Sequence, residues 1–132
     1  MTIDPEARAR GIDVLEQLGW NDIPNLKAMD EEFYDFTVEN CFGAVWAREG
    51  MSMRDRELIT LAVLVAFNRT DGMKPHLRNA HHVGISEREV RELIYQVMYY
   101  AGWSVGPNAM RAYKEVLSEP APYQVATTRR ET

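Results

Sequence analysis

Apolar residues recur along most of the chain with the spacing of an α-helix. In residues 25–40, Leu26, Met29, Phe33 and Phe36 are three or four positions apart, which places their side chains on one helical face. No stretch carries a convincing strand pattern, and no repeat of fixed period is present. We therefore expect an all-α bundle with helical segments over residues 4–19, 25–40, 52–68, 73–84, 86–102 and 107–119.

The ends of these segments are marked by capping residues and by helix breakers. Ser86 and Glu89 form a capping box at the start of the fifth segment. We expect a break at Gly43, an interruption at residues 69–72, and Pro75 in the first turn of the helix that follows.

The segment over residues 52–68 is apolar on all sides beyond Glu57, a pattern typical of a helix that is buried on most sides. Tryptophans and tyrosines elsewhere add apolar surface that a chain of 132 residues has difficulty covering. We therefore expect a homo-oligomer, because association covers such surface.

Composition and charge limit the classes of partner and the cellular location that we expect. A net charge of −5 argues against nonspecific nucleic-acid binding and gives no reason to expect an anionic membrane surface. Cys41 is the only cysteine, which fits a reducing compartment. The N-terminus carries no apolar signal region, and the longest apolar run, residues 58–67, is about half the length of a membrane span. We expect a soluble cytoplasmic protein.

All three histidines lie in the stretch KPHLRNAHHVG, and one of them projects toward the predicted core. At about 100° per residue, His76 falls inside the apolar arc of its helix and His81 lies at the edge of that arc. His82 points away, together with Arg78 and Asn79. We expect a buried His76, either as a proton-handling group or as a core histidine bonded to a backbone carbonyl.

Glu57 is the second polar residue on an apolar face, which it shares with Leu61 and Leu64. A buried carboxylate at this position would indicate a site. An exposed acid would instead complement the dipole at the start of its helix. Both interpretations stay open at this point.

The histidine spacing does not favour a metal site. His76 and His81 are five positions apart, about 140° around a helix, and adjacent histidines diverge by about 100°. No two histidines have the H-x3-H spacing that places two ligands on one face. We expect no metal ion at these histidines.

An ordered set of motifs runs through the chain: R-D-R-E-L, H-L-R, G-x-[ST]-x-x-E-[IV]-R-E and Y-A-G-W. With these motifs the chain resembles the carboxymuconolactone decarboxylase family, within the alkylhydroperoxidase-D-like superfamily. The resemblance implies a single domain over residues 1–132, with a core of about 25–118 and a tail over 119–132. It also implies an all-α bundle of about six helices that assembles as a trimer or hexamer.

The peroxidase branch of that superfamily has the pattern E-x11-C-x2-C-x3-H. Glu57 and His76 have the spacing of its glutamate and histidine, whereas Arg69 and Gly72 occupy the two cysteine positions. Without the thiols, peroxide reduction by dithiol chemistry is not expected. The remaining pair of residues resembles the decarboxylase branch.

The resemblance implies removal of a carboxylate from a small-molecule γ-lactone without a metal ion or organic cofactor, in a pathway of aromatic-compound catabolism of the β-ketoadipate type. His76 would be the proton donor or the partner of the oxyanion, with Glu57 orienting it. His81 would be a second acid or a carboxylate anchor. The expected substrate-binding residues are Arg54, Arg78, Gln96, Tyr100 and Trp103.

Departures from the family pattern leave two alternatives open. His81 and His82 stand where an apolar residue and an asparagine are usual, and Ser104 replaces a proline after Y-A-G-W. The first alternative is a related lactone isomerase or tautomerase that acts on a bulkier aromatic or polyketide-like substrate. The second is a non-catalytic ligand-binding or assembly module on the same fold.

Overall fold

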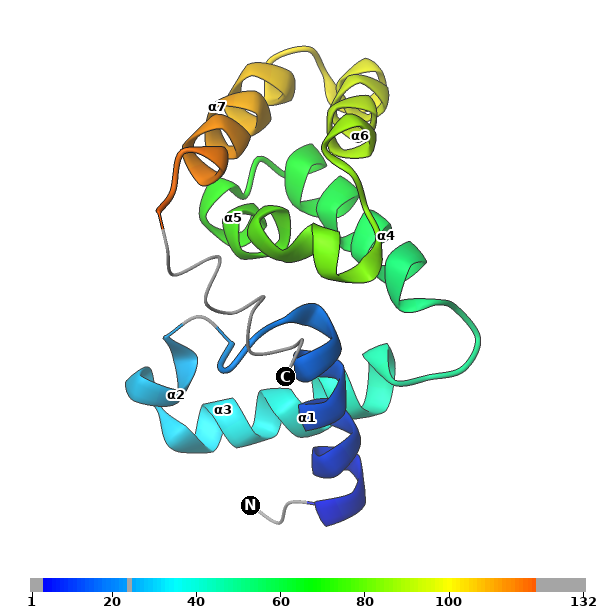
Figure 1. Cartoon of the computed structure of the whole chain (residues 1–132), viewed down its shortest axis with the longest axis vertical. Helices are drawn as coiled ribbons and strands as arrows, with labels where there is room; N and C mark the ends of the chain where they lie inside the picture. The colour runs from blue at the N-terminus through cyan, green and yellow to red at the C-terminus, as the bar shows by residue number, and fades with distance from the viewer. Residues whose placement is uncertain (1–3, 24, 121–132) are drawn as a thin grey trace.

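The computed structural model describes residues 4–23 and 25–120, and these residues form helices and connecting turns without a strand (Figure 1). The prediction of an all-α domain is confirmed. The α-helices are α1 (Pro5–Leu18), α2 (Leu26–Met29), α3 (Glu31–Thr37), α4 (Met53–Ala66), α5 (Thr70–Asn79), α6 (Glu87–Ala101) and α7 (Val105–Leu117). A π-helix, Val38–Trp46, continues α3, and a 3₁₀-helix, Ala80–Val83, continues α5. Of the predicted tail, residues 121–132 lie outside the described residues.

The helices form two groups, each with its own apolar core (Figure 1). Helices α4 to α7 surround a core that we call the aliphatic core. Its buried members are Leu61, Val65, Met73, Leu77, Ala80, Ile85, Val90, Ile94, Val105, Ala109, Ala112, Tyr113 and Val116. Helix α1, α3 and the π-helix surround the aromatic core. Its buried members are Val14, Leu15, Leu18, Trp20, Tyr34, Val38, Phe42 and Trp46. Val83 packs against both cores.

Helix α1 lies against the π-helix with their backbones in close approach. A Cβ atom on Gly11 would lie 2.1 Å from the Val38 carbonyl oxygen, and one on Gly43 would lie 2.0 Å from that of Ala7. The predicted break at Gly43 is therefore wrong. This glycine lies inside the π-helix, where the missing side chain allows the two helices to touch.

The start of α5 also differs from the prediction. Asn68 ends α4 in the left-handed region (φ 57°), and the Arg69 N–H donates to the Leu64 carbonyl at 2.8 Å. Helix α5 then begins at Thr70, so that the predicted interruption at residues 69–72 is mostly helix and Pro75 lies in the second turn. Pro75 has no N–H to donate to the carbonyl of Asp71, an exposed residue one turn earlier in the helix.

Helix α4 is not covered on most sides within one chain, contrary to the prediction from its composition. Leu61 and Val65 are fully buried, whereas Ile59, Val63 and Phe67 are 50%, 47% and 69% exposed. One face of the helix therefore packs on the aliphatic core and the opposite face is apolar surface. Among the described residues, no helix is long and apolar enough to cross a membrane.

Candidate active site

Glu57 is completely buried in the second turn of α4. The helix begins after Ser52, whose hydroxyl accepts the Asp55 N–H at 3.0 Å, and this cap sets the register of the residues that follow. Glu57 then falls on the same face as Leu61 and Val65, both with no exposed surface. The interpretation of Glu57 as an exposed acid at the helix start is thereby excluded.

His76 of α5 is the partner of this carboxylate. Its Nδ1 atom lies 2.6 Å from Oε1 of Glu57, and its side chain is 13% exposed. The predicted inward orientation of His76 is confirmed. The open question of its partner is answered by a carboxylate rather than a backbone carbonyl.

The second oxygen of Glu57 makes the arrangement costly. Oε2 is buried and has no hydrogen-bond partner among the described residues. Desolvating a carboxylate is expensive, and one imidazole contact satisfies only part of its hydrogen-bonding capacity. Such a pair adds little to stability compared with apolar residues of the same size, so its presence points to chemistry.

Two indole rings enclose the imidazole of His76. Trp46, at the end of the π-helix, is stacked on it with 6.2 Å between ring centroids and 12° between planes. Trp20, just after α1, meets it edge-on at 4.8 Å and 63°. Phe42 contacts both tryptophans, at 6.0 Å from Trp20 and 5.8 Å from Trp46.

Neither Trp20 nor Trp46 was identified as a site residue from the sequence. Trp46 lies inside the segment that carries the family motifs, but nothing in the sequence distinguishes it from an ordinary core residue. Trp20 is 56 positions from His76, and no local periodicity relates residues in different helices. A search for aromatic residues next to helix ends would have found Trp20 only as a core candidate.

The structure places His81 away from this pair. His81 is exposed, and it lines a cavity of about 270 Å³ together with Leu77, Tyr113 and Glu119. The residues that line this cavity include neither Glu57 nor His76. The role of His81 as a second acid or anchor stays a prediction.

The prediction that Asn79 and His82 point away from the protein is wrong, because α1 covers that face. Asn79 is buried, and its Nδ2 donates to the Gly19 carbonyl at 3.2 Å. The ring of His82 lies so close to Gly19 that a Cβ there would be 2.4 Å from it. The helix therefore packs on two sides, against the aliphatic core and against the end of α1, and periodicity alone indicates only the first.

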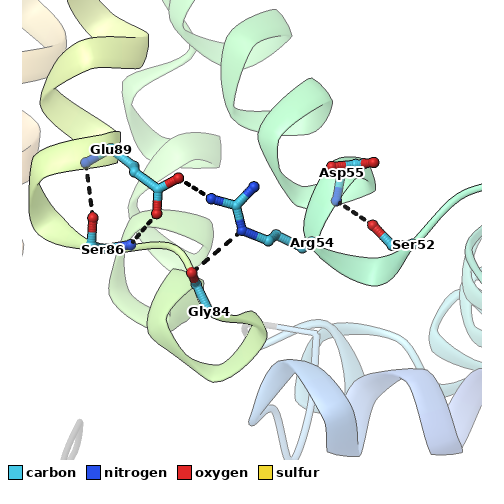
Figure 2. A network of polar contacts seen from close by, with 6 residues as sticks. All are labelled: Ser52, Arg54, Asp55, Gly84, Ser86 and Glu89. Carbon is cyan, nitrogen blue, oxygen red and sulfur yellow. Dashed lines mark hydrogen bonds and ion pairs between the residues drawn. The ribbon is translucent and has the colours of Figure 1, made fainter.

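The two arginines expected to hold a substrate carboxylate are engaged by carboxylates of the chain. Figure 2 shows the Arg54 guanidinium between Glu89, with which it forms an ion pair, and the Gly84 carbonyl, to which Nε donates at 3.4 Å. Arg78 donates two hydrogen bonds to Glu119, at 2.5 and 2.7 Å. A substrate would have to displace these partners.

Gln96, Tyr100 and Trp103, the remaining expected binding residues, lie near the C-terminal end of α6 and are exposed. Tyr100 is 86% and Trp103 is 70% exposed, so in a single chain they form surface rather than the wall of a cavity. Among the described residues, no cluster of three or more His, Cys, Asp or Glu side chains is arranged to hold a metal ion.

Comparison with known proteins identifies the family. The family model described as the carboxymuconolactone decarboxylase family matches residues 31–115 of this chain. The chain belongs to this family. The matched residues include Trp46, Glu57 and His76, whereas Trp20 precedes them.

Two relatives in the comparison are both decarboxylases. The chain is 34% identical over 97 residues to the 4-carboxymuconolactone decarboxylase of Acinetobacter baylyi, covering 74% of this chain and 72% of that protein. It is 29% identical over 68 residues to the nitrosuccinic acid decarboxylase of Metarhizium robertsii, covering 52% of this chain and 48% of that protein. Membership of the family and both relatives support a decarboxylase-family function.

Proposed function

We propose that this chain is a cofactor-independent decarboxylase that removes a carboxylate from a γ-lactone of the 4-carboxymuconolactone type. The observation that carries the proposal is the fully buried Glu57 bonded to His76 at 2.6 Å. The function of the relative with 34% identity supports the substrate class.

The two nitrogens of the His76 imidazole have different roles. Glu57 accepts the hydrogen bond from Nδ1, which fixes the ring orientation and leaves Nε2 as the nitrogen available to a substrate. As an imidazolium, the ring keeps its Nδ1–H bonded to Glu57, donates its second proton from Nε2, and is left as the neutral tautomer with the proton on Nδ1. Glu57 is thus the positioning residue, and His76 is the acid.

The reaction balances without a cofactor because the substrate is its own electron sink. The bond between the carboxylate carbon and the ring breaks, carbon dioxide leaves, and the electron pair moves through the conjugated double bond onto the carbonyl oxygen of the lactone. His76 then protonates the resulting dienolate at carbon. The surrounding indoles keep water from the departing carboxylate, which favours formation of the neutral product.

Substrate binding by Gln96, Tyr100 and Trp103 fits best with an assembled protein. Ile59, Val63 and Phe67 of α4 add to the apolar surface that one chain leaves exposed. We propose that a second copy covers part of this surface, in a trimer or hexamer. Light scattering should give a mass several times that of one chain, and replacing Phe67 by Glu should lower it. A monomer at micromolar concentration would contradict this proposal.

Conservative variants of the pair test the catalytic proposal. His76→Gln keeps an amide that can donate to Glu57 but removes the titrating acid, so release of carbon dioxide from 4-carboxymuconolactone should fall to background. Glu57→Gln should lower the rate by about two to four orders of magnitude. His81→Ala should have a smaller effect. Arg88→Ala, on the exposed face of α6, serves as the control with unchanged rate.

Several outcomes of that experiment separate the alternatives. A folded, fully active His76→Gln variant would contradict the catalytic assignment. An absorbance change without carbon dioxide release would favour the isomerase or tautomerase alternative. Binding without turnover would favour the non-catalytic module. Because Arg69 and Gly72 occupy the thiol positions, a peroxide assay with a dithiol donor should stay at background.

A further inference from the structure

Trp20 contacts the proposed acid from a part of the chain that precedes the residues matched by the family model. That model begins at residue 31, and Trp20 follows the C-terminal end of α1. Its side chain is nearly buried, and its ring meets the His76 imidazole edge-on at 4.8 Å. The N-terminal segment therefore reaches the site directly.

The turn that carries Trp20 is held firmly in place. Gly19 adopts φ 79°, a conformation that favours glycine, and its N–H donates to the Glu16 carbonyl at 3.0 Å. The Trp20 N–H donates to the Leu15 carbonyl at 2.8 Å. These bonds fix the backbone from which the indole reaches His76 of α5.

The same turn is attached to the helical run that bears His76. Asn79, three positions after His76, donates to the Gly19 carbonyl at 3.2 Å. The His82 ring lies against the Gly19 backbone. These two contacts fix the turn relative to the helical run. The Trp20 indole is therefore held at a fixed distance from the His76 imidazole.

We propose that Trp20 is a positioning residue that holds the His76 imidazole in the one orientation that presents Nδ1 to Glu57. This proposal rests on the proposed function of His76. Rotation of the ring by half a turn about its Cβ–Cγ bond would place a carbon atom opposite the carboxylate. The Trp46 face and the Trp20 edge leave little room for that rotation.

The role differs from simple core packing in what it predicts. Trp20 also belongs to the aromatic core, so any smaller residue there lowers stability. A packing role alone would leave catalysis unchanged in the folded fraction. A positioning role lowers kcat while leaving KM unchanged, because the defect lies in the orientation of the acid rather than in substrate binding.

The experiment compares Trp20→Leu, Trp20→Phe and Tyr34→Leu below their melting transitions. Tyr34 is a buried aromatic residue of the same core without a recorded ring contact to His76, so its replacement is the matched control. Trp20→Leu should lower kcat on 4-carboxymuconolactone by about 10- to 100-fold. Trp20→Phe should restore most of the rate, and Tyr34→Leu should keep it.

Nitrogen-15 NMR of the imidazole provides a readout that does not depend on turnover. In the neutral form of the ring, the wild-type chain and Tyr34→Leu should show the His76 proton on Nδ1, whereas Trp20→Leu should show a mixture of tautomers. An unchanged tautomer and kcat in Trp20→Leu, or an equal loss in Tyr34→Leu, would overturn the proposal. If His76→Gln were active, the proposed function would fail, while the NMR comparison would still decide whether Trp20 orients the ring.

Discussion

The aliphatic core and the aromatic core contribute different things to the candidate site. Helices α4 and α5, which pack on the aliphatic core, supply the ionisable pair, Glu57 and His76. The aromatic core supplies the flat indole walls, Trp20 and Trp46. The pair therefore lies where the two groups of helices meet.

The spacing of the ionisable pair and the surroundings of the imidazole therefore depend on different parts of the fold. Two side chains on adjacent packed helices keep their separation, because a well-packed interior resists deformation. The indoles come from the other group of helices and define the surroundings of the ring. Changes in α1 or the π-helix therefore act on the orientation of the His76 ring, whereas the spacing of α4 and α5 is set by the aliphatic core.

The largest expected effect comes from removing one member of the buried pair. His76→Leu leaves the Glu57 carboxylate buried without its imidazole partner, so the free energy of unfolding should fall by about 3–5 kcal/mol in urea titrations. The double variant with Glu57→Leu should recover most of this loss, since apolar residues can replace such a pair. Equal destabilisation of the single and double variants would show that the carboxylate is not the source of the cost.

A smaller effect should follow from adding one methyl group between α1 and the π-helix. Helix propensity alone predicts that Gly11→Ala stabilises the chain by about 1 kcal/mol. The contact with the Val38 carbonyl predicts a loss of about 1–3 kcal/mol instead. Thermal unfolding shows whether Gly11→Ala raises or lowers the stability of the chain. Gly50→Ala is the control, because its added Cβ would have no atom within 4 Å.

Hydrogen exchange on Gly11→Ala would then sharpen the comparison of the two cores. We expect amides of α1 to lose protection while those of α6 and α7 keep it, because only the aromatic core is disturbed. Equal loss of protection in all helices would mean that the two cores unfold as one cooperative unit.

The smallest effect concerns the ion pair at the end of α7. Hydrogen bonds from Arg78 hold the pKa of the Glu119 carboxyl below its ordinary value of 4.5. The contribution of a carboxylate with a lowered folded-state pKa is complete above that ordinary value and is lost as the pH falls through the lowered one. Glu119→Gln should therefore cost about 0.5 kcal/mol at pH 7.

That difference should shrink in unfolding measurements as the pH is lowered below 4.5. Glu92→Gln is the comparison, because its pair with Arg88 has a longer separation of 3.5 Å and is more exposed. A cost for Glu119→Gln that persists at low pH would show that packing, rather than charge, is responsible.

Local patterns in the sequence were sufficient to predict the orientation or the cap of those residues whose environment is set by their own helix. The azimuth of His76 predicted its inward orientation, and Glu57 shared the apolar face of Leu61 and Leu64. The Ser86–Glu89 capping box also forms as its four-residue pattern indicates, with both reciprocal hydrogen bonds present (Figure 2). Periodicity and capping depend on residues three or four positions apart, which one segment contains in full.

Tertiary structure alone decided the features that depend on a second segment. Gly43 lies inside a helix, and its lack of a side chain allows α1 to pack against it. Asn79 is buried beneath the turn after α1, where it donates a hydrogen bond to the Gly19 carbonyl. Trp20 became part of the site through the turn after α1, far from His76 in sequence. The periodicity of a helix specifies which side chains share a face, but the partner for that face is set by packing between distant segments.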